Sequence, residues 1–108
     1  MIIDDERDLC HLMTSFLVQM GHEVQAAYSL TEGLDTVEQM HPDIVILDNN
    51  LPDGFGWDNI ANIHSVEPSC KILLISAYAY KLKSETAPQN VSIIEKPISL
   101  LKLQNYFA

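Results

Sequence analysis

The 108-residue sequence is poor in basic residues and in cysteine. It has six Lys and Arg against fifteen Asp and Glu, a formal net charge of −9. Because nucleic-acid affinity rests on clustered Lys and Arg, this balance argues against direct nucleic-acid contact by this domain. The two cysteines, Cys10 and Cys70, lie in apolar segments without metal-ligand spacing. They are interpreted as buried reduced thiols, which predicts a cytoplasmic location.

Long apolar runs and a glycine-rich phosphate loop are also missing. No apolar run approaches the ~20 residues that span a bilayer, and no signal peptide opens the chain, so no membrane partner is expected. No G-x-G-x-x-G follows the first aliphatic segment, which disfavours dinucleotide binding. With 47% hydrophobic residues, the chain is interpreted as one globular domain that covers residues 1–108.

Short aliphatic segments alternate with amphipathic ones along the whole chain. The aliphatic segments predict strands at residues 1–3, 23–27, 44–47, 71–76 and 91–95. Helical spacing predicts helices over residues 9–20, 30–40, 57–66 and 99–107, with only a faint stripe over 77–86. Ser29 and Glu32 predict a capping box at the second helix. Such alternation predicts an α/β fold, a doubly wound parallel sheet with right-handed crossovers and helices on both faces.

Polar side chains stand where these strands end. They are Asp4, Asp5, Asp48, Ser76 and Lys96. Ligands bind at this edge of open α/β sheets, so we expect the five side chains to form one site. Neighbouring carboxylates repel one another, and Mg²⁺ with oxygen ligands relieves that repulsion; the backbone carbonyl of Asn50 is a candidate further ligand. A lysine and a hydroxyl beside them suit a phosphoryl group, which predicts that Asp48 is a nucleophile that forms an aspartyl phosphate.

Four motifs in this order resemble the CheY-like receiver domain of bacterial two-component response regulators. They are Ile3-Asp4-Asp5-Glu6, Ile46 to Gly54 (ILDNNLPDG), Leu74-Ile75-Ser76-Ala77 and Glu95-Lys96-Pro97. The resemblance implies a flavodoxin-like five-stranded sheet with strand order 2-1-3-4-5. It implies that Asp48 accepts a phosphoryl group from a sensor histidine kinase or a phosphotransfer protein. It further implies that Asp5, Asp48 and the Asn50 carbonyl hold Mg²⁺ with Asp4 assisting through water, while Ser76 and Lys96 bind the phosphoryl oxygens.

The resemblance also implies a signalling domain rather than an enzyme, one that assists its own phosphorylation and dephosphorylation. The expected readout surface comprises residues 78–86, 92–95 and 99–107. The chain begins almost on the first strand and stops within the last helix, so a longer regulator with an effector domain is expected, and a homodimer is allowed.

The sequence departs from the family pattern at two places. Ile93 occupies the position where the family often has an aromatic switch residue, so that relay is expected to be absent. Residues 77–90 are short for a loop and helix, which predicts a short or frayed fourth helix.

Two other functions remain open on the sequence. A Mg²⁺-dependent phosphohydrolase of the haloacid dehalogenase type also passes through an aspartyl phosphate. It needs a second acid two residues after the nucleophile, where this chain has Asn50. The second alternative is a pseudo-receiver, which binds a partner without being phosphorylated. The presence of the acids, Ser76 and Lys96 argues against this function.

Overall fold

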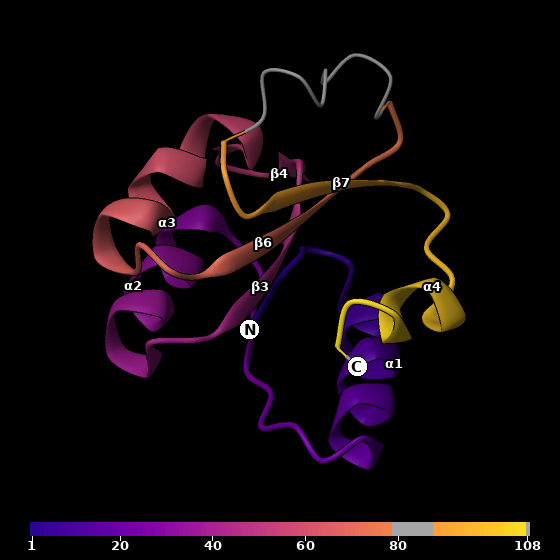
Figure 1. The fold of residues 1–108 in the computed structure, drawn as a ribbon. Helices are drawn as coiled ribbons and strands as arrows, with labels where there is room; N and C mark the ends of the chain where they lie inside the picture. Colours follow the sequence, from indigo (N-terminus) through magenta and orange to yellow (C-terminus); the bar gives the residue numbers. More distant parts are fainter. Residues whose placement is uncertain (79–87, 108) are drawn as a thin grey trace.

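The computed structural model describes residues 1–78 and 88–107, and its core is a five-stranded parallel sheet. The strands of this sheet are β1 (Ile2–Ile3), β2 (Ala26–Ala27), β3 (Ile44–Asp48), β6 (Lys71–Ser76) and β7 (Val91–Glu95). Their order is β2-β1-β3-β6-β7, and every neighbouring pair is parallel (Figure 1). In sequence order of the sheet strands this is 2-1-3-4-5, which confirms the predicted flavodoxin-like topology.

Helices cover both faces of the sheet. They are α1 (Arg7–Gln19), α2 (Leu30–Met40), α3 (Ile60–Val66) and α4 (Leu100–Gln104), and the 3₁₀ helix η1 (Trp57–Asn59) precedes α3. Figure 1 shows α2 and α3 on one side of the sheet and α1 and α4 on the other. Among the described residues, no helix is long and apolar enough to cross a bilayer.

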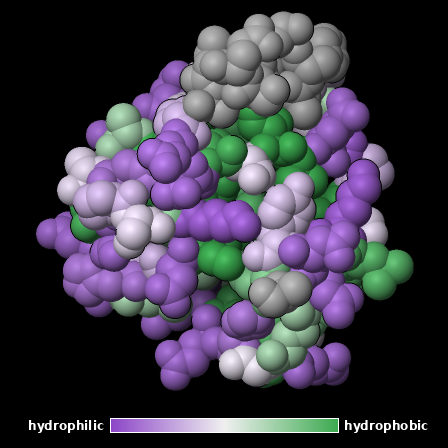
Figure 2. All heavy atoms as spheres, in the orientation of Figure 1, coloured by the Kyte–Doolittle hydropathy of each residue, from purple (hydrophilic) through white to green (hydrophobic). Residues whose placement is uncertain are grey.

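Successive strand residues point to opposite faces and so feed two separate cores. In β3, Val45 and Leu47 pack in the cluster beneath α2 and α3, whereas Ile46 packs in the cluster beneath α1 and α4. Because helices cover both faces of the sheet, the sequence of β3 is a continuous aliphatic run and does not alternate between apolar and polar residues. At the surface that Figure 2 shows, hydrophilic residues lie mostly to the left and right, and hydrophobic residues are visible between them.

The observed bounds differ most from the predicted ones in the second strand and in the last helix. Strand β2 covers only Ala26–Ala27 instead of residues 23–27, because its register pairs it with the two residues of β1. Helix α4 ends at Gln104 rather than at 107, and three-residue turns follow, in which Tyr106 and Phe107 donate to the carbonyls of Leu103 and Gln104. The predicted fourth helix falls mostly on residues 79–87, which lie outside the described residues.

A small hairpin follows β3 and was not predicted. Its strands, β4 (Asn50–Leu51) and β5 (Gly54–Phe55), are antiparallel. The backbone of Gly54 has φ +149°, a conformation that side chains rarely allow, which explains the glycine in this turn. The hairpin folds the chain back over the end of β3, next to Asp48.

The free backbone amides at the start of α2 donate hydrogen bonds to side chains from two places, the residue before the helix and the loop after β3. The Ser29 hydroxyl accepts from the amide of Glu32 at 3.2 Å, which confirms the Ser29 half of the capping box. The Glu32 carboxylate accepts from the amide of Tyr28 rather than from that of Ser29. The amides of Leu30 and Thr31 donate to Asp53 at 2.8 and 2.9 Å. The loop after β3 is therefore fastened to α2.

Candidate functional site

The carboxyl ends of four strands lie together at one edge of the sheet. Asp4 follows β1, Asp48 ends β3, Ser76 ends β6 and Lys96 follows β7. A cavity of about 250 Å³ opens there, lined by Asp48, Asn49, Asn50, Phe55, Ser76, Ala77, Tyr78 and Lys96. Parallel strands explain this convergence, since all of their carboxyl ends lie at the same edge of the sheet. The structure thus brings together the polar side chains that the sequence placed at the strand ends.

Three carboxylates gather beside this cavity. One oxygen each of Asp4, Asp5 and Asp48 lies within 4.8 Å of the others. Asp4 and Asp48 are buried, whereas Asp5 is exposed. The Asp4 Oδ1 accepts a hydrogen bond from the amide of Glu6 at 2.9 Å, but its buried Oδ2 has no hydrogen-bond partner among the residues that the structure describes. A buried carboxylate oxygen without a partner is costly, and a hard cation would satisfy it, so these residues fit Mg²⁺.

Burial and mutual repulsion change the protonation of these acids. Burial raises the pKa of Asp4 to about 6. The negative charge of Asp48 also raises this pKa, whereas the hydrogen bond from the Glu6 amide lowers it. Burial also raises the pKa of Asp48, although the Lys96 ammonium opposes this shift. Burial lowers the pKa of Lys96, but Asp48, Glu6 and Asp4 outweigh it and the net shift is upward. Lys96 is therefore a fixed positive charge in this pocket.

The Lys96 ammonium lies between two carboxylates. Its Nζ is 3.3 Å from Asp48 Oδ1 and 3.2 Å from Glu6 Oε1. The backbone amide of Lys96 donates to the carbonyl of Ser76 at 2.9 Å, which joins the two residues at the ends of β6 and β7. The peptide bond from Lys96 to Pro97 is cis. Ser76 is nearly buried, and its hydroxyl accepts from the amide of Tyr78 at 3.1 Å.

The loop after Asp48 is held by Asn49. Its amide donates to the carbonyl of Ile75, and its side-chain Oδ1 accepts from the amide of Trp57, both at 2.9 Å. Its carbonyl accepts from the amide of Gly56. A Cβ at Gly56 would lie 2.6 Å from the carbonyl oxygen of Asp48, so only glycine allows this close approach. The exposed Asn50 begins the hairpin at the mouth of the pocket.

Sequence reasoning missed three residues around the site. Glu6 was not assigned a role, although it directly follows two acids at a strand end. Asn49 and Asp53 stand in the ILDNNLPDG motif without an assigned role, although Asn and Asp do accept backbone hydrogen bonds in such segments. Ile93 is half-buried in β7, at the position expected to lack an aromatic relay.

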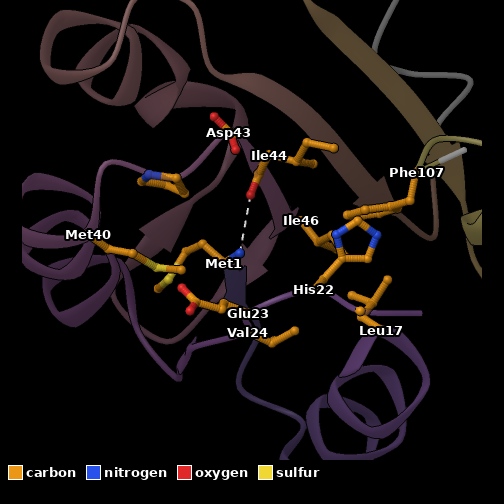
Figure 3. A pocket seen from close by; sticks show the side chains of 12 residues that line it. Met1, Leu17, His22, Glu23, Val24, Met40, Asp43, Ile44, Ile46 and Phe107 are labelled. Carbon is orange, nitrogen blue, oxygen red and sulfur yellow. Dashed lines mark hydrogen bonds between the residues drawn. The ribbon is translucent and has the colours of Figure 1, made fainter. Parts of the chain in front are cut away.

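A second cavity lies at the opposite, amino-terminal edge of the sheet. It measures about 390 Å³ and is bounded by Met1, the end of α1 and the segment before β3 (Figure 3). The amino group of Met1 donates to the carbonyl of Ile44 at 3.2 Å. Apolar side chains line this cavity together with the exposed acids Glu23 and Asp43. It shares no lining residue with the pocket around Asp48.

The chain is similar to known signalling proteins over most of its length. It is 35% identical over 103 residues to the transcriptional regulatory protein YxdJ of Bacillus subtilis, covering 92% of this chain and 44% of that protein. It is 32% identical over 80 residues to the chemotaxis protein CheY of Thermotoga maritima, covering 71% of this chain and 65% of CheY. The chain thus spans less than two thirds of either relative.

Solved structures and a family model agree with these relatives. The structure resembles a CheY-like response regulator receiver domain from Methanospirillum hungatei with a TM-score of 0.87 and 25% identity, covering 98% of this chain and 86% of the other. The model of the response regulator receiver domain matches residues 1–108. Since the match includes every strand end that contributes to the acidic pocket, the chain belongs to the response regulator receiver domain family of two-component systems.

Proposed function

We propose that this domain is a phosphoacceptor switch and that Asp48 takes the phosphoryl group. The observation that carries the proposal is the position of the Lys96 ammonium, 3.3 Å from Asp48 Oδ1, where Asp48 also belongs to a cluster of carboxylates with Asp4 and Asp5. A buried aspartate beside a fixed positive charge suits a nucleophile whose product is a dianion. The donor is a phosphohistidine on a sensor histidine kinase or on a phosphotransfer protein.

The transfer requires little covalent chemistry from the protein. A carboxylate oxygen of Asp48 attacks the phosphorus, the phosphorus–nitrogen bond breaks, and the histidine nitrogen keeps the electron pair and takes up a proton. Lys96 and Ser76 bind the oxygens of the transferred group, and their positions matter because phosphoryl transfer depends mainly on alignment and charge neutralisation. The domain thereby assists its own phosphorylation and dephosphorylation without being an enzyme in the ordinary sense.

Mg²⁺ is the cofactor that the acidic residues suit. We assign it to Asp5, Asp48 and the backbone carbonyl of Asn50, with Asp4 acting through water. The buried Oδ2 of Asp4, which has no hydrogen-bond partner within residues 1–78 and 88–107, supports this assignment. When bound, the ion neutralises charge on the phosphoryl oxygens.

The switch is read on the face that includes β7 and α4, where residues 92–95 and 99–107 belong to the proposed readout surface. Residues 79–87 complete it in the sequence but lie outside the described residues. Since the chain spans only part of its curated relatives, an effector domain in a longer protein and a homodimer are parts of the proposal. We do not propose that this domain contacts nucleic acid or a membrane directly.

A cytoplasmic location is also proposed. Cys10 and Cys70 are buried in the two different cores, on opposite faces of the sheet, so they cannot pair with each other. Burial raises the pKa of both thiols to about 11. Two thiols held apart and protonated are compatible with a reducing compartment.

The test is phosphorylation by acetyl phosphate with Mg²⁺, followed by intact-protein mass spectrometry. The wild-type domain should gain one phosphoryl group, and Asp48→Asn should gain none. Asp35→Asn, which removes an exposed acid on α2, is the matched control and should behave like wild type. A phosphorylated phosphotransfer protein serves as a second donor, because small donors do not suit every receiver.

The outcomes separate the three functions. A wild-type chain that gains no phosphoryl group from either donor is a pseudo-receiver, and the proposal is then wrong. Steady release of phosphate from a phosphomonoester such as p-nitrophenyl phosphate would instead indicate a phosphohydrolase. Asn50 argues against that activity, since an amide cannot act as the required general acid or base.

A further inference from the structure

Glu6 connects the start of α1 to the lysine of the pocket. Its Oε1 accepts a hydrogen bond from Lys96 Nζ at 3.2 Å, across 90 residues of sequence. The same Nζ is 3.3 Å from Asp48 Oδ1. The side chain of Glu6 is 61% exposed and that of Lys96 is 23% exposed, whereas that of Asp48 is only 3% exposed. The ammonium therefore lies between a carboxylate in the pocket and one at its rim.

Among the described residues, the side chain of Glu6 contacts Lys96 but does not cap α1. Glu6 is the N-cap residue of α1, but it makes no side-chain capping hydrogen bond. What Glu6 gives to the neighbouring structure is its backbone amide, which donates to Asp4 Oδ1 at 2.9 Å. Because any residue at this position has that amide, replacing the side chain leaves the contact with Asp4 in place. The carboxylate of Glu6 can thus be removed without disturbing the helix start.

We propose that Glu6 is a positioning residue for the phosphoacceptor site, which holds the Lys96 ammonium in the resting state and competes with the phosphoryl group for it. This inference rests on the proposed function and deepens it. Glu6 sets how strongly the site binds a phosphoryl group and hence how far the switch moves at a given supply of donor.

The competition follows from the charges. Two carboxylates share one ammonium in the resting state. Phosphorylation replaces the single negative charge of the Asp48 carboxylate with a phosphoryl group that carries close to two, and it places three acceptor oxygens in front of Lys96. The backbone of Lys96 is fixed by its bond to the Ser76 carbonyl, so only the side chain can turn toward the new group. That turn breaks the contact with Glu6 and leaves the carboxylate of Glu6 near a dianion, which disfavours the phosphorylated state.

The experiment measures binding of beryllofluoride, a stable mimic of a phosphoryl group, at saturating Mg²⁺ by isothermal titration calorimetry. Glu6→Gln should bind beryllofluoride roughly two- to fivefold more tightly than wild type, the range expected for an exposed ion pair. Glu6→Ser is a second variant, since serine is a favoured N-cap residue and keeps the start of α1 stable. Glu38→Gln, an exposed acid on α2, is the control and should not change the affinity.

Salt distinguishes a charge effect from a structural one. The ratio of affinities between Glu6→Gln and wild type should approach one when ionic strength rises toward 1 M, because exposed charges are then screened within about 3 Å. Equal or weaker binding by both uncharged variants at low salt overturns the inference. If wild type binds beryllofluoride and the variants match it, the proposed function stands and only the role of Glu6 falls. If wild type binds none, the proposed function itself fails.

Discussion

Asp53 bonds to both the backbone amide and the hydroxyl of Thr31, each at 2.9 Å, although the two residues lie in different elements. The aspartate belongs to the turn that follows the proposed phosphoacceptor, and the threonine belongs to the first turn of α2. The contact places a negative charge where the helix dipole favours it. It fixes the loop beside Asp48 to a rigid helix.

We expect Asp53→Ala to lower the melting temperature more than Asp58→Ala does, because only Asp53 bonds to the amides of Leu30 and Thr31. These amide bonds hold the pKa of Asp53 below its usual range. The contribution of Asp53 should therefore be present above pH 4 and be lost as the pH falls through the lowered pKa. Thermal unfolding of both variants between pH 3 and pH 7 measures this. Equal melting temperatures at pH 7 would contradict the capping role.

Asp4→Asn should stabilise the metal-free domain at pH 7. The pKa of Asp4 is about 6 in the folded protein and near 3.8 when unfolded, so the folded state binds the proton more tightly. Stability of the wild type should then fall as the pH rises from about 4 to 6 and change no further above that range. The gain from Asp4→Asn should be roughly 2–3 kcal/mol at pH 7 and close to zero at pH 4. Chemical denaturation at the two pH values measures the difference.

With Mg²⁺ present, the wild type should be more stable than Asp4→Asn. Added ion stabilises the wild-type fold by mass action, and Asp4→Asn should gain less because it has lost a carboxylate of the acidic cluster. Glu38→Gln, in which the lost acid is exposed on α2, serves as the control and should follow wild type with and without the ion. If Asp4→Asn stabilised the metal-free domain equally at pH 4 and pH 7, burial and charge repulsion at Asp4 would not be the cause of that stabilisation.

Gly56→Ala should destabilise the fold and weaken the site together. The added Cβ would lie 2.6 Å from the Asp48 carbonyl oxygen and 2.9 Å from Leu47 Cγ, and a backbone oxygen cannot move aside cheaply. A loss of about 1–3 kcal/mol is expected, with reduced phosphorylation of Asp48. Gly21→Ala is the comparison, since nothing lies within 4 Å of a Cβ there and its cost arises from the positive φ alone. Gly21→Ala should retain phosphorylation.

Lys96→Met should cost about 1–3 kcal/mol at pH 7, because it leaves the buried carboxylate of Asp48 without its nearest positive charge. Adding Asp48→Asn should restore most of that loss. Denaturant unfolding of the two single variants and the double variant gives the coupling energy between the residues. Additive effects in this cycle would show that the Lys96–Asp48 contact contributes little.

The sequence predicted the strand ends well because they follow from strong local signals, whereas the sheet order was implied by the resemblance to receiver domains and not by any local pattern. The aliphatic runs of β3 and β6 are buried on both faces, and each stops at a polar residue that lies in the pocket, Asp48 and Ser76. It could not predict Glu6, Asn49 or Asp53, whose partners are Lys96, Trp57 and Thr31. These contacts depend on how loops close in space, and no periodicity carries that information. For the same reason β2 was predicted too long, since its length is set by its partner β1.

The two-sided packing of β3 has a consequence for how the site can evolve. Inserting or deleting a single residue within β3 would exchange the two cores' side chains and turn the Asp48 carboxylate to the other face of the sheet. Such a change would unfold the domain before it could produce a misaligned but folded switch. The orientation of Asp48 is therefore tied to the stability of the whole fold.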